Sequence, residues 1–442
     1  MTAQASPDRA HPAARAYLSE TDHARARALF DRLREISFDG VGISRESYGP
    51  LETQAMEMIE AEGRALGAEI RWDAARNLRV ALPGRMPALP VVAAGSHLDS
   101  VPQGGNFDGA AGVLAALLAL RAAHARGETL RTIELHVLRA EESAWFGGPC
   151  YFGSRALFGQ ITGRDLESRH RSADRNLAEQ MAAAGVDLAP LRAGTPLDDP
   201  ARFHAWIELH IEQGPVLIDR DCPMGVVTGI RGNVRHRRVS VTGEAAHSGA
   251  VPRWLRRDAV LAMAELLMRL DEHWRVLLEW GEDLVVTSGI VETDPAEHAV
   301  SRVPGRVAFA LEYRSQDPKT LEAFGRLIAR ECGEIGARRG VAFELGEGVP
   351  TAPARMSERL VAGLLAAAEA AQVPAHVMAS GAGHDSAVFA NAGVPSAMVF
   401  VRNRNGSHNP HEAMEYADFA RAAEAMARAL WAAAQDPAEA PE

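Results

Sequence analysis

The stretch Gly95–Gly112 reads GSHLDSVPQGGNFDGAAG and carries a histidine and two aspartates at a fixed spacing. His97 and Asp99 are separated by one residue, and Asp108 follows after a glycine-rich loop. The apolar run VVAA precedes the stretch, and a helical pattern rich in alanine and leucine starts at Ala110. We therefore expect the polar residues between the end of a strand and the start of a helix, the edge where α/β sheets bind ligands.

Taken alone, this stretch has two interpretations. In the first, His97 and Asp108 bind metal, and Asp99 orients the ring of His97. In the second, the stretch is a polar turn that contains one hydrogen-bonded histidine. Other stretches of the sequence are needed to distinguish the two interpretations.

The segments that follow predict a fold of the α/β class. A strand ending at His97, a helix over 110–125 and a strand over 132–140 indicate a βαβ unit with a parallel sheet. From about residue 225 the order changes to βαββαβ, which is typical of a ferredoxin-like domain. Strands that end in polar loops return after residue 347. We therefore expect a first domain made of 1–224 and 348–442, and a second domain, 225–347, inserted into it.

Composition excludes several classes of protein. A chain of 442 residues is long enough for two domains, and its net charge of −11 argues against a nucleic acid partner. No run approaches the ~18 apolar residues of a membrane span. The three cysteines show no CxxC spacing, which suggests a reducing compartment. Because the first residues also lack a signal-peptide core, we expect a cytoplasmic protein.

Five stretches place residues of metal-binding type just after apolar runs. They contain His97 with Asp108, Glu141 with Glu142, His210, His384 with Asp385, and His408. A lone histidine is more often structural, and paired glutamates usually face solvent. Acidic residues at a buried strand end are costly, however, unless they are paired or bind metal. The recurrence in five places favours a binuclear metal site.

The chemistry of such a site requires this set of residues. Two divalent ions about 3.5–4 Å apart need a bridging carboxylate, which a short aspartate supplies. Imidazole and carboxylate ligands without thiolate suit Zn, Mn, Co or Ni. Of Glu141 and Glu142, one would bind metal and its neighbour would act as a general base for the bridging water.

Six motifs together resemble the amidase/hydantoinase/carbamoylase family. They are GSHLDSVPQGGNFDGAAGV from Gly95, EES at 141–143, ELHIEQGPVL at 208–217, GEAAHSGAVPRWLRRDA at 243–259, SGAGHDS at 380–386 and GSHNPHE at 406–412. Members of this family include N-carbamoyl-L-amino acid amidohydrolases, allantoate amidohydrolases and β-ureidopropionases. The resemblance implies a metallopeptidase-like catalytic domain, with a mixed sheet flanked by helices, and an inserted α+β domain for closure and dimerisation.

The resemblance also implies a role for each site residue. His97 and His210 would hold one metal ion, Glu142 and His408 the other, and Asp108 would bridge them. Glu141 would be the general base, and Asp99 would fix the tautomer of His97. His247 would stabilise the oxyanion and Arg314 would bind the substrate carboxylate, while His384 and Gln213, in the family motifs AGHDS and HIEQG, would also contact the substrate.

Three departures from the family pattern concern substrate recognition. Ser301 stands where the family usually has asparagine, and Asn233 stands where glutamine is common. Arg253 replaces the usual methionine of the motif around His247. We therefore expect Asn233 and Ser301 to belong to the substrate-binding set and to affect specificity.

The predicted function is a metal-dependent amidohydrolase with two divalent ions per subunit. It would cleave a linear C–N bond of a small, carboxylate-bearing carbamoyl substrate, first of all an N-carbamoyl-L-amino acid. Allantoate and β-ureidopropionate are alternative substrates. A peptidase or N-acyl amino acid deacylase is a further alternative, followed by a binding protein without turnover. The resemblance implies a homodimer formed through the inserted domain.

Overall fold

The computed structural model describes residues 16–147 and 150–437 and divides into two compact units. One unit comprises Met1–Thr228 and Met356–Glu442, and the other comprises Gly229–Arg355. The sequence pattern places the limits of the insertion at 225 and 347, a few residues earlier. The difference at the first limit has a clear reason: Met224–Ile230 is β6, a strand of the large sheet.

The first unit is built around a mixed sheet with the strand order β1-β2-β4-β3-β5-β17-β6. Its strands are β1 (Glu69–Trp72), β2 (Leu78–Leu82), β3 (Val91–His97), β4 (Ile133–Leu138), β5 (Phe203–Ile211) and β17 (Ser396–Val401), with β16 (Ala375–Ser380) and β15 (Ala354–Arg355) beside β6. The four central strands, β4, β3, β5 and β17, are parallel to one another. The predicted βαβ unit and mixed sheet are therefore confirmed.

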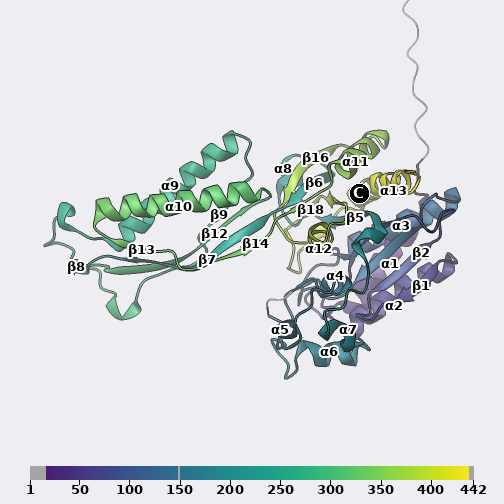
Figure 1. Ribbon diagram of the computed structural model, residues 1–442, viewed down its shortest axis with the longest axis horizontal. Helices are drawn as coiled ribbons and strands as arrows, with labels where there is room; N and C mark the ends of the chain where they lie inside the picture. The colour runs from purple at the N-terminus through teal and green to yellow at the C-terminus, as the bar shows by residue number, and fades with distance from the viewer. Residues whose placement is uncertain (1–15, 148–149, 438–442) are drawn as a thin grey trace, which may run out of the picture. The chain divides into compact units, whose positions relative to one another are not determined.

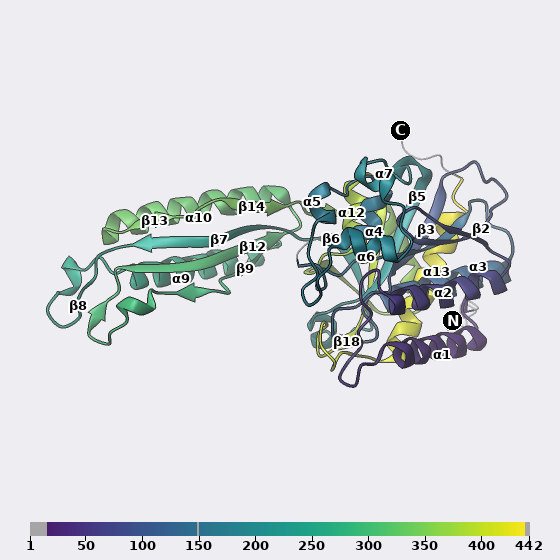
Figure 2. The ribbon, with the colours of Figure 1, turned by 90° about the horizontal axis from the view of Figure 1, so that it is seen from below.

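Burial explains why the central strands are mainly apolar. Every residue of β3, β4, β5 and β17 is buried, because helices cover both faces of the sheet. Figure 2 shows α3 and α13 on one side and α4 and α12 on the other. The helices of this unit are α1 (Glu20–Ser37), α2 (Pro50–Ala65), α3 (Ala110–Arg126), α4 (Phe152–Leu157), α5 (Gly163–Leu166), α6 (Leu177–Ala183), α7 (Leu188–Arg192), α8 (Val216–Asp219), α11 (Glu358–Ala370), α12 (Asp385–Asn391) and α13 (Tyr416–Ala434).

Helix α3 connects β3 to β4 and lies against the sheet. It packs on β3 and β5 and also contacts α1 and α13, so its residues are apolar on almost every side. The helix ends where Gly127 adopts a φ of 108°, a conformation that residues with a side chain rarely adopt. Because parallel strands point the same way, the carboxyl ends of β3, β4 and β5 meet at one edge of the sheet.

The second unit has its own sheet and its own apolar core. Its main strands are β7 (Gly232–Thr242), β9 (Val285–Thr287), β10 (Val291–Glu292), β12 (Arg306–Ser315), β13 (Ala342–Glu344) and β14 (Gly348–Thr351), and β8 (Ala246–His247) pairs with β11 (Arg302–Val303). The long helices α9 (Ala259–Glu279) and α10 (Pro318–Arg339) pack against this sheet (Figure 1). The order β10-β12-β7-β13 is that of a ferredoxin-like βαββαβ fold.

Among the described residues, no helix is long and apolar enough to pass through a membrane. Two further short strands, β18 (Asn403–Arg404) and β19 (Ala413–Met414), form a hairpin in the first unit. This hairpin encloses the polar loop of the GSHNPHE motif.

Candidate metal centre

His97 is the last residue of β3, and contacts at its Nδ1 fix the orientation of the ring. Its Nδ1 lies 3.2 Å from Oδ1 of Asp99 and 3.2 Å from the carbonyl oxygen of Asp99, so Nδ1 carries the hydrogen. Its Nε2 is buried and has no hydrogen-bond partner within the described part of the chain. A buried imidazole nitrogen without a hydrogen-bond partner is available to a metal ion.

Asp108 lies at the end of the loop that leads from β3 to α3, and its Oδ1 faces two histidines. This oxygen is 3.1 Å from Nε2 of His210 and 3.6 Å from Nε2 of His97. His210 is on β5, and its Nδ1 donates to the carbonyl oxygen of Ile211 over 2.9 Å, which leaves Nε2 free of hydrogen. Gly109 makes this approach possible, since a Cβ there would lie 2.5 Å from the His97 ring.

The other oxygen of Asp108 faces a second pair of residues. Oδ2 is 3.5 Å from Nε2 of His408, and this nitrogen is 3.4 Å from Oε1 of Glu142. Oε1 of Glu142 is buried and is another atom without a hydrogen-bond partner among the described residues. The structure thus forms two groups of possible ligands, His97–Asp108–His210 and Asp108–Glu142–His408, whose donor atoms lie within 4.8 Å of one another in each group. Asp108 belongs to both.

The acidic side chains in and beside the two groups favour a positive charge between them. Burial lowers the pKa of His97, but the charges of Glu141 and Asp99 outweigh burial and raise it well above its usual value. Burial and the neighbouring Asp108 raise the pKa of Glu142 well above its usual range. Both shifts favour the protonated forms because negative charge is concentrated here, and a bound cation would balance the same negative charge. With their orphaned nitrogen and oxygen donors, the residues fit divalent ions that accept imidazole and carboxylate ligands.

Asp99 connects the histidine to the two glutamates. Its carboxylate accepts the backbone N–H groups of Glu141 and Glu142, each over 3.1 Å, and the hydroxyl of Ser47 over 2.6 Å. Burial alone would raise the pKa of Asp99, but these donors, first of all His97, hold it below its usual value. Asp99 therefore contacts more than was predicted: besides the ring of His97, it binds the backbone of the turn that carries both glutamates.

Glu141 lies beside the two groups without belonging to either. Its Oε2 is 3.8 Å from Nε2 of His97. Burial raises the pKa of Glu141 well above its usual range, and the charge of Glu142 adds to this effect while His97 opposes it. A buried carboxyl group with a raised pKa next to possible metal ligands has the properties of a proton-transfer group.

Two other predicted site residues of the first unit make protein contacts here. Gln213 donates from Nε2 to Oδ2 of Asp108 over 2.7 Å, and its Oε1 is buried without a partner in the described ranges. The ring of His384 lies 4.4 Å from that of His210, and its Nε2 lies 3.1 Å from the hydroxyl of Ser380. Burial lowers the pKa of His384 well below its usual value, so it is a neutral neighbour of the first group.

The remaining predicted residues belong to the second unit. Nδ1 of His247 accepts the N–H of Gly249 over 3.1 Å, so the neutral ring carries its hydrogen on Nε2 and can donate from there. Arg314 donates from Nε to Glu312 over 3.0 Å, and its strand partner Asn233 is buried. The carbonyl oxygen of Ser301 accepts the N–H of Ser248 over 2.8 Å, which ties it to the loop of His247.

Three residues that contact the site were not predicted from the sequence. Ser47 donates to Asp99, Ser407 donates to Asp108, and Glu412 accepts the N–H of Asp108 over 3.3 Å. Burial and the charge of Asp108 raise the pKa of Glu412 to about 7. Ser407 and Glu412 both belong to the GSHNPHE motif, which was a signal for them. Ser47 had no such signal, since it lies far from every motif.

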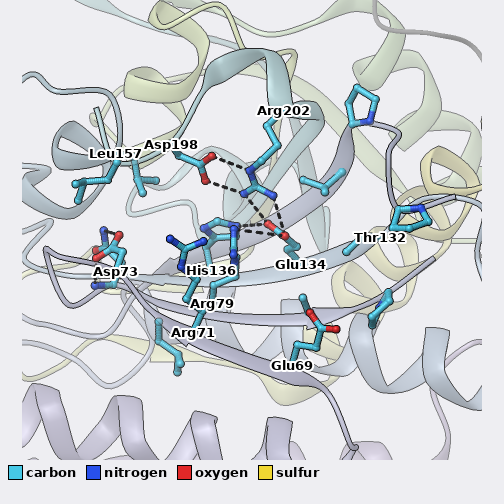
Figure 3. Close-up of a pocket in the computed structure, with 18 of the residues that line it drawn as sticks. Glu69, Arg71, Asp73, Arg79, Thr132, Glu134, His136, Leu157, Asp198 and Arg202 are labelled. Carbon is cyan, nitrogen blue, oxygen red and sulfur yellow. Dashed lines mark hydrogen bonds and ion pairs between the residues drawn. The ribbon is translucent and has the colours of Figure 1, made fainter. Parts of the chain in front are cut away.

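A second buried charged cluster lies in the same unit and lines a cavity of about 710 Å³ (Figure 3). Arg202 donates two hydrogen bonds of 2.8 Å to the two oxygens of Glu134, and Asp198 binds the same guanidinium group from the other side. His136 also lies 2.9 Å from Glu134. Because these charges neutralise one another, the cluster does not require an ion.

Comparison with known proteins agrees with this arrangement. The sequence pattern of peptidase family M20/M25/M40 matches residues 93–432. The chain is 34% identical over 412 residues to an N-carbamoyl-L-amino-acid amidohydrolase from Paenarthrobacter aurescens, covering 92% of this chain and 98% of that protein. It is also 34% identical to allantoate amidohydrolase from Escherichia coli (strain K12), covering 88% of this chain and 92% of that one.

Solved structures lead to the same family. A crystal structure of an amidase of the hydantoinase/carbamoylase family from Burkholderia multivorans superposes with a TM-score of 0.81 at 28% identity. The alignment covers 94% of this chain and 98% of that chain. The chain therefore belongs to peptidase family M20/M25/M40 and, within it, to the amidase/hydantoinase/carbamoylase family.

Proposed function

We propose that this protein is a metal-dependent amidohydrolase that cleaves a linear C–N bond of a small, carboxylate-bearing carbamoyl substrate. One observation carries the proposal. Asp108 stands between two groups of ligand-type residues, with Oδ1 towards His97 and His210 and Oδ2 towards His408. The names of the relatives support the substrate class, since several are carbamoyl-L-amino acid amidohydrolases.

The proposed centre holds two divalent ions, of Zn, Mn, Co or Ni. His97 and His210 would hold one ion, Glu142 and His408 the other, with Asp108 shared between them. When bound, such ions polarise a carbonyl group and acidify water. Glu141 would take the proton from that water and deliver it to the leaving nitrogen, a task that its raised pKa supports.

The substrate-binding roles belong to the same proposal. Arg314 would bind the substrate carboxylate with its planar guanidinium fork, and His247 would donate from Nε2 to the developing oxyanion. Gln213, Asn233, Ser301 and His384 would complete the recognition of the substrate. We also propose a homodimer formed through the second unit, and a cytoplasmic location.

The preferred substrate is an N-carbamoyl-L-amino acid. Allantoate is the second candidate, because one relative of 34% identity is an allantoate amidohydrolase and others are ureidoglycolate hydrolases. β-Ureidopropionate and N-acyl amino acids or dipeptides are further alternatives.

Release of ammonia tests the proposal. Metal-free protein is incubated with Mn²⁺, Co²⁺, Ni²⁺ or Zn²⁺ and with a panel of N-carbamoyl-L-amino acids, their D-enantiomers, N-carbamoyl-β-alanine and allantoate. We expect ammonia from an N-carbamoyl-L-amino acid only when metal is added. Turnover of dipeptides or N-acyl amino acids in place of the ureido compounds would overturn the substrate class, and turnover without metal would overturn the mechanism.

A further inference from the structure

Glu412 is the last residue of the GSHNPHE motif, and the proposed function gives it no role. It is 8% exposed, belongs to the loop that carries His408, and contacts the loop that carries Asp108. These loops are far apart in the sequence, but both must be in place for Asp108 and His408 to face one ion.

The carboxylate of Glu412 contacts both loops. Its Oε1 accepts the backbone N–H of Phe107 over 2.8 Å and that of Asp108 over 3.3 Å. Its Oε2 lies 3.0 Å from the hydroxyl of Ser407, the residue next to His408, and the same hydroxyl contacts Oδ2 of Asp108. One side chain thus links the backbone of the first loop to the second loop.

Gly105 provides the space for this link. A Cβ at this position would lie 2.1 Å from Cδ and 2.2 Å from Oε1 of Glu412. Gly105 does not adopt a positive φ, so its lack of a side chain, rather than its backbone, is what the contact needs. An alanine at this position would therefore displace the Glu412 carboxylate in particular.

The two ligand groups depend on this link to different degrees. His97 and His210 are on strands of the central sheet, and each has its own hydrogen bond to a neighbouring oxygen. The side chain of His408 is 53% exposed and lies on a loop. The position of His408 relative to Asp108 therefore relies on contacts between the two loops.

We propose that Glu412 is a positioning residue that fixes the His408 loop against the Asp108 loop, so that the group Asp108–Glu142–His408 can hold an ion. The proposal rests on the proposed function in that it needs a metal at this group, but it does not depend on the substrate. The proposal predicts different effects on the affinities for the two ions. Loss of Glu412 weakens binding of the ion held by Glu142 and His408 and leaves binding of the other ion almost unaffected.

Titration of the metal-free protein with Co²⁺ tests this difference, with binding followed by calorimetry and by the visible absorption of the ion. For the wild type we expect two binding events. For Glu412→Ala and for Gly105→Ala we expect the second event to weaken by about 10- to 100-fold, the usual effect of removing a partner that orients metal ligands. Glu412→Gln should restore most of the affinity, because its amide can accept from Phe107 and donate to Ser407.

Matched variants and a second readout separate positioning from a general loss of stability. Glu134→Gln changes a buried carboxylate remote from both groups, and Gly163→Ala adds a Cβ where no atom lies within 4 Å. Both should bind two ions as the wild type does. The thermal unfolding midpoint of each metal-free variant is measured in parallel.

The outcomes are distinct. If Glu412→Ala lowers the unfolding midpoint but binds both ions with wild-type affinity, or weakens both equally, the positioning role is refuted while the proposed function stands. If the wild type binds no Co²⁺, the proposed function itself fails. Selective weakening of one event, with recovery in Glu412→Gln, supports the proposal.

Discussion

Two clusters of buried charged residues lie in the first unit. They differ in whether an arginine of the chain pairs with their carboxylates. Around Glu134, the carboxylate receives two hydrogen bonds from Arg202, and its pKa falls below the usual range because His136 and Arg202 outweigh burial. Around Asp108, no arginine or lysine contacts the ligand groups among the described residues, and the pKa of Glu142 rises. Glu134, Asp108 and Glu142 are all buried, so burial of the carboxylates alone does not distinguish the clusters.

The difference shows what marks a functional cluster. Nε2 of His97 and Oε1 of Glu142 are buried without partners in the described part of the chain, whereas both oxygens of Glu134 are paired. Unpaired buried polar atoms are costly, and two of them at potential ligand positions in one cluster favour a partner from outside the chain. The Asp108 cluster therefore has the donor atoms for an added cation, whereas Arg202 balances Glu134 from within the chain.

The largest expected effect comes from the residue that both ligand groups share. In Asp108→Ala we expect loss of both ions and a fall in ammonia release of at least ~10³-fold, since metal ions contribute several kcal/mol to the transition state. Metal content after dialysis and the rate of hydrolysis measure this. The control Asp198→Ala, in the other cluster, should keep both ions, and an Asp108→Ala protein that still holds two ions would contradict the comparison.

Removal of charge next to the ligands should separate binding from proton transfer. In Glu141→Gln we expect kcat to fall by about 10²–10⁴-fold while two ions remain bound, because the amide cannot accept a proton. Glu134→Gln is the matched change in the other cluster and should leave kcat unaltered. Near-normal turnover in Glu141→Gln with full metal content would assign the base elsewhere.

The smallest effect belongs to the Glu134 cluster and concerns stability. In Arg202→Met we expect a loss of about 1.5–3 kcal/mol in the free energy of unfolding at pH 7, the cost of removing hydrogen bonds to a charged group. Metal content should not change. Urea denaturation measures the loss, and a variant as stable as the wild type would show that Glu134 does not need its partner.

The pH dependence of this loss has a definite sign. The folded-state pKa of Glu134 is lowered, so its stabilising contribution is fully present above the unfolded value of about 4.3 and disappears as the pH falls through the folded value. The difference between wild type and Arg202→Met should therefore shrink between pH 5 and pH 3. A difference that grows in acid would contradict the assignment.

Candidate site residues at the ends of predicted strands could be identified from the sequence. Residues that reach the site through contacts distant in the chain could not. His97 and His210 lie at the carboxyl ends of β3 and β5, Asp108 and Glu142 lie in the loops after β3 and β4, and these parallel strands end at one edge. Glu412 and Ser47 could not be placed in the same way, since their partners, Asp108 and Asp99, are distant in the chain. The same limit applies to Arg202 and Glu134, whose pairing has no local pattern.

The fold shows a similar division. The helix after Asp108 and the βαββαβ order of the insertion follow from periodicity and were predicted. Two strands of the large sheet, β6 and β16, and the C-terminal helix α13 were not predicted. β6 directly precedes the first strand of the insertion, and only its pairing with β17 assigns it to the first sheet. Pairing of this kind is a tertiary contact, which local sequence does not encode.

The junction of the two units has a consequence for folding. The insertion leaves the first unit at Thr228 and returns at Met356, and the N–H of Met356 donates to the carbonyl oxygen of Thr228 over 3.1 Å. Within the insertion, Gly229 and Arg355 are also paired. If the insertion folds first, its two ends lie side by side. The loop-closure entropy for pairing β17 with the sheet is then that of a short turn, not that of a loop as long as the insertion.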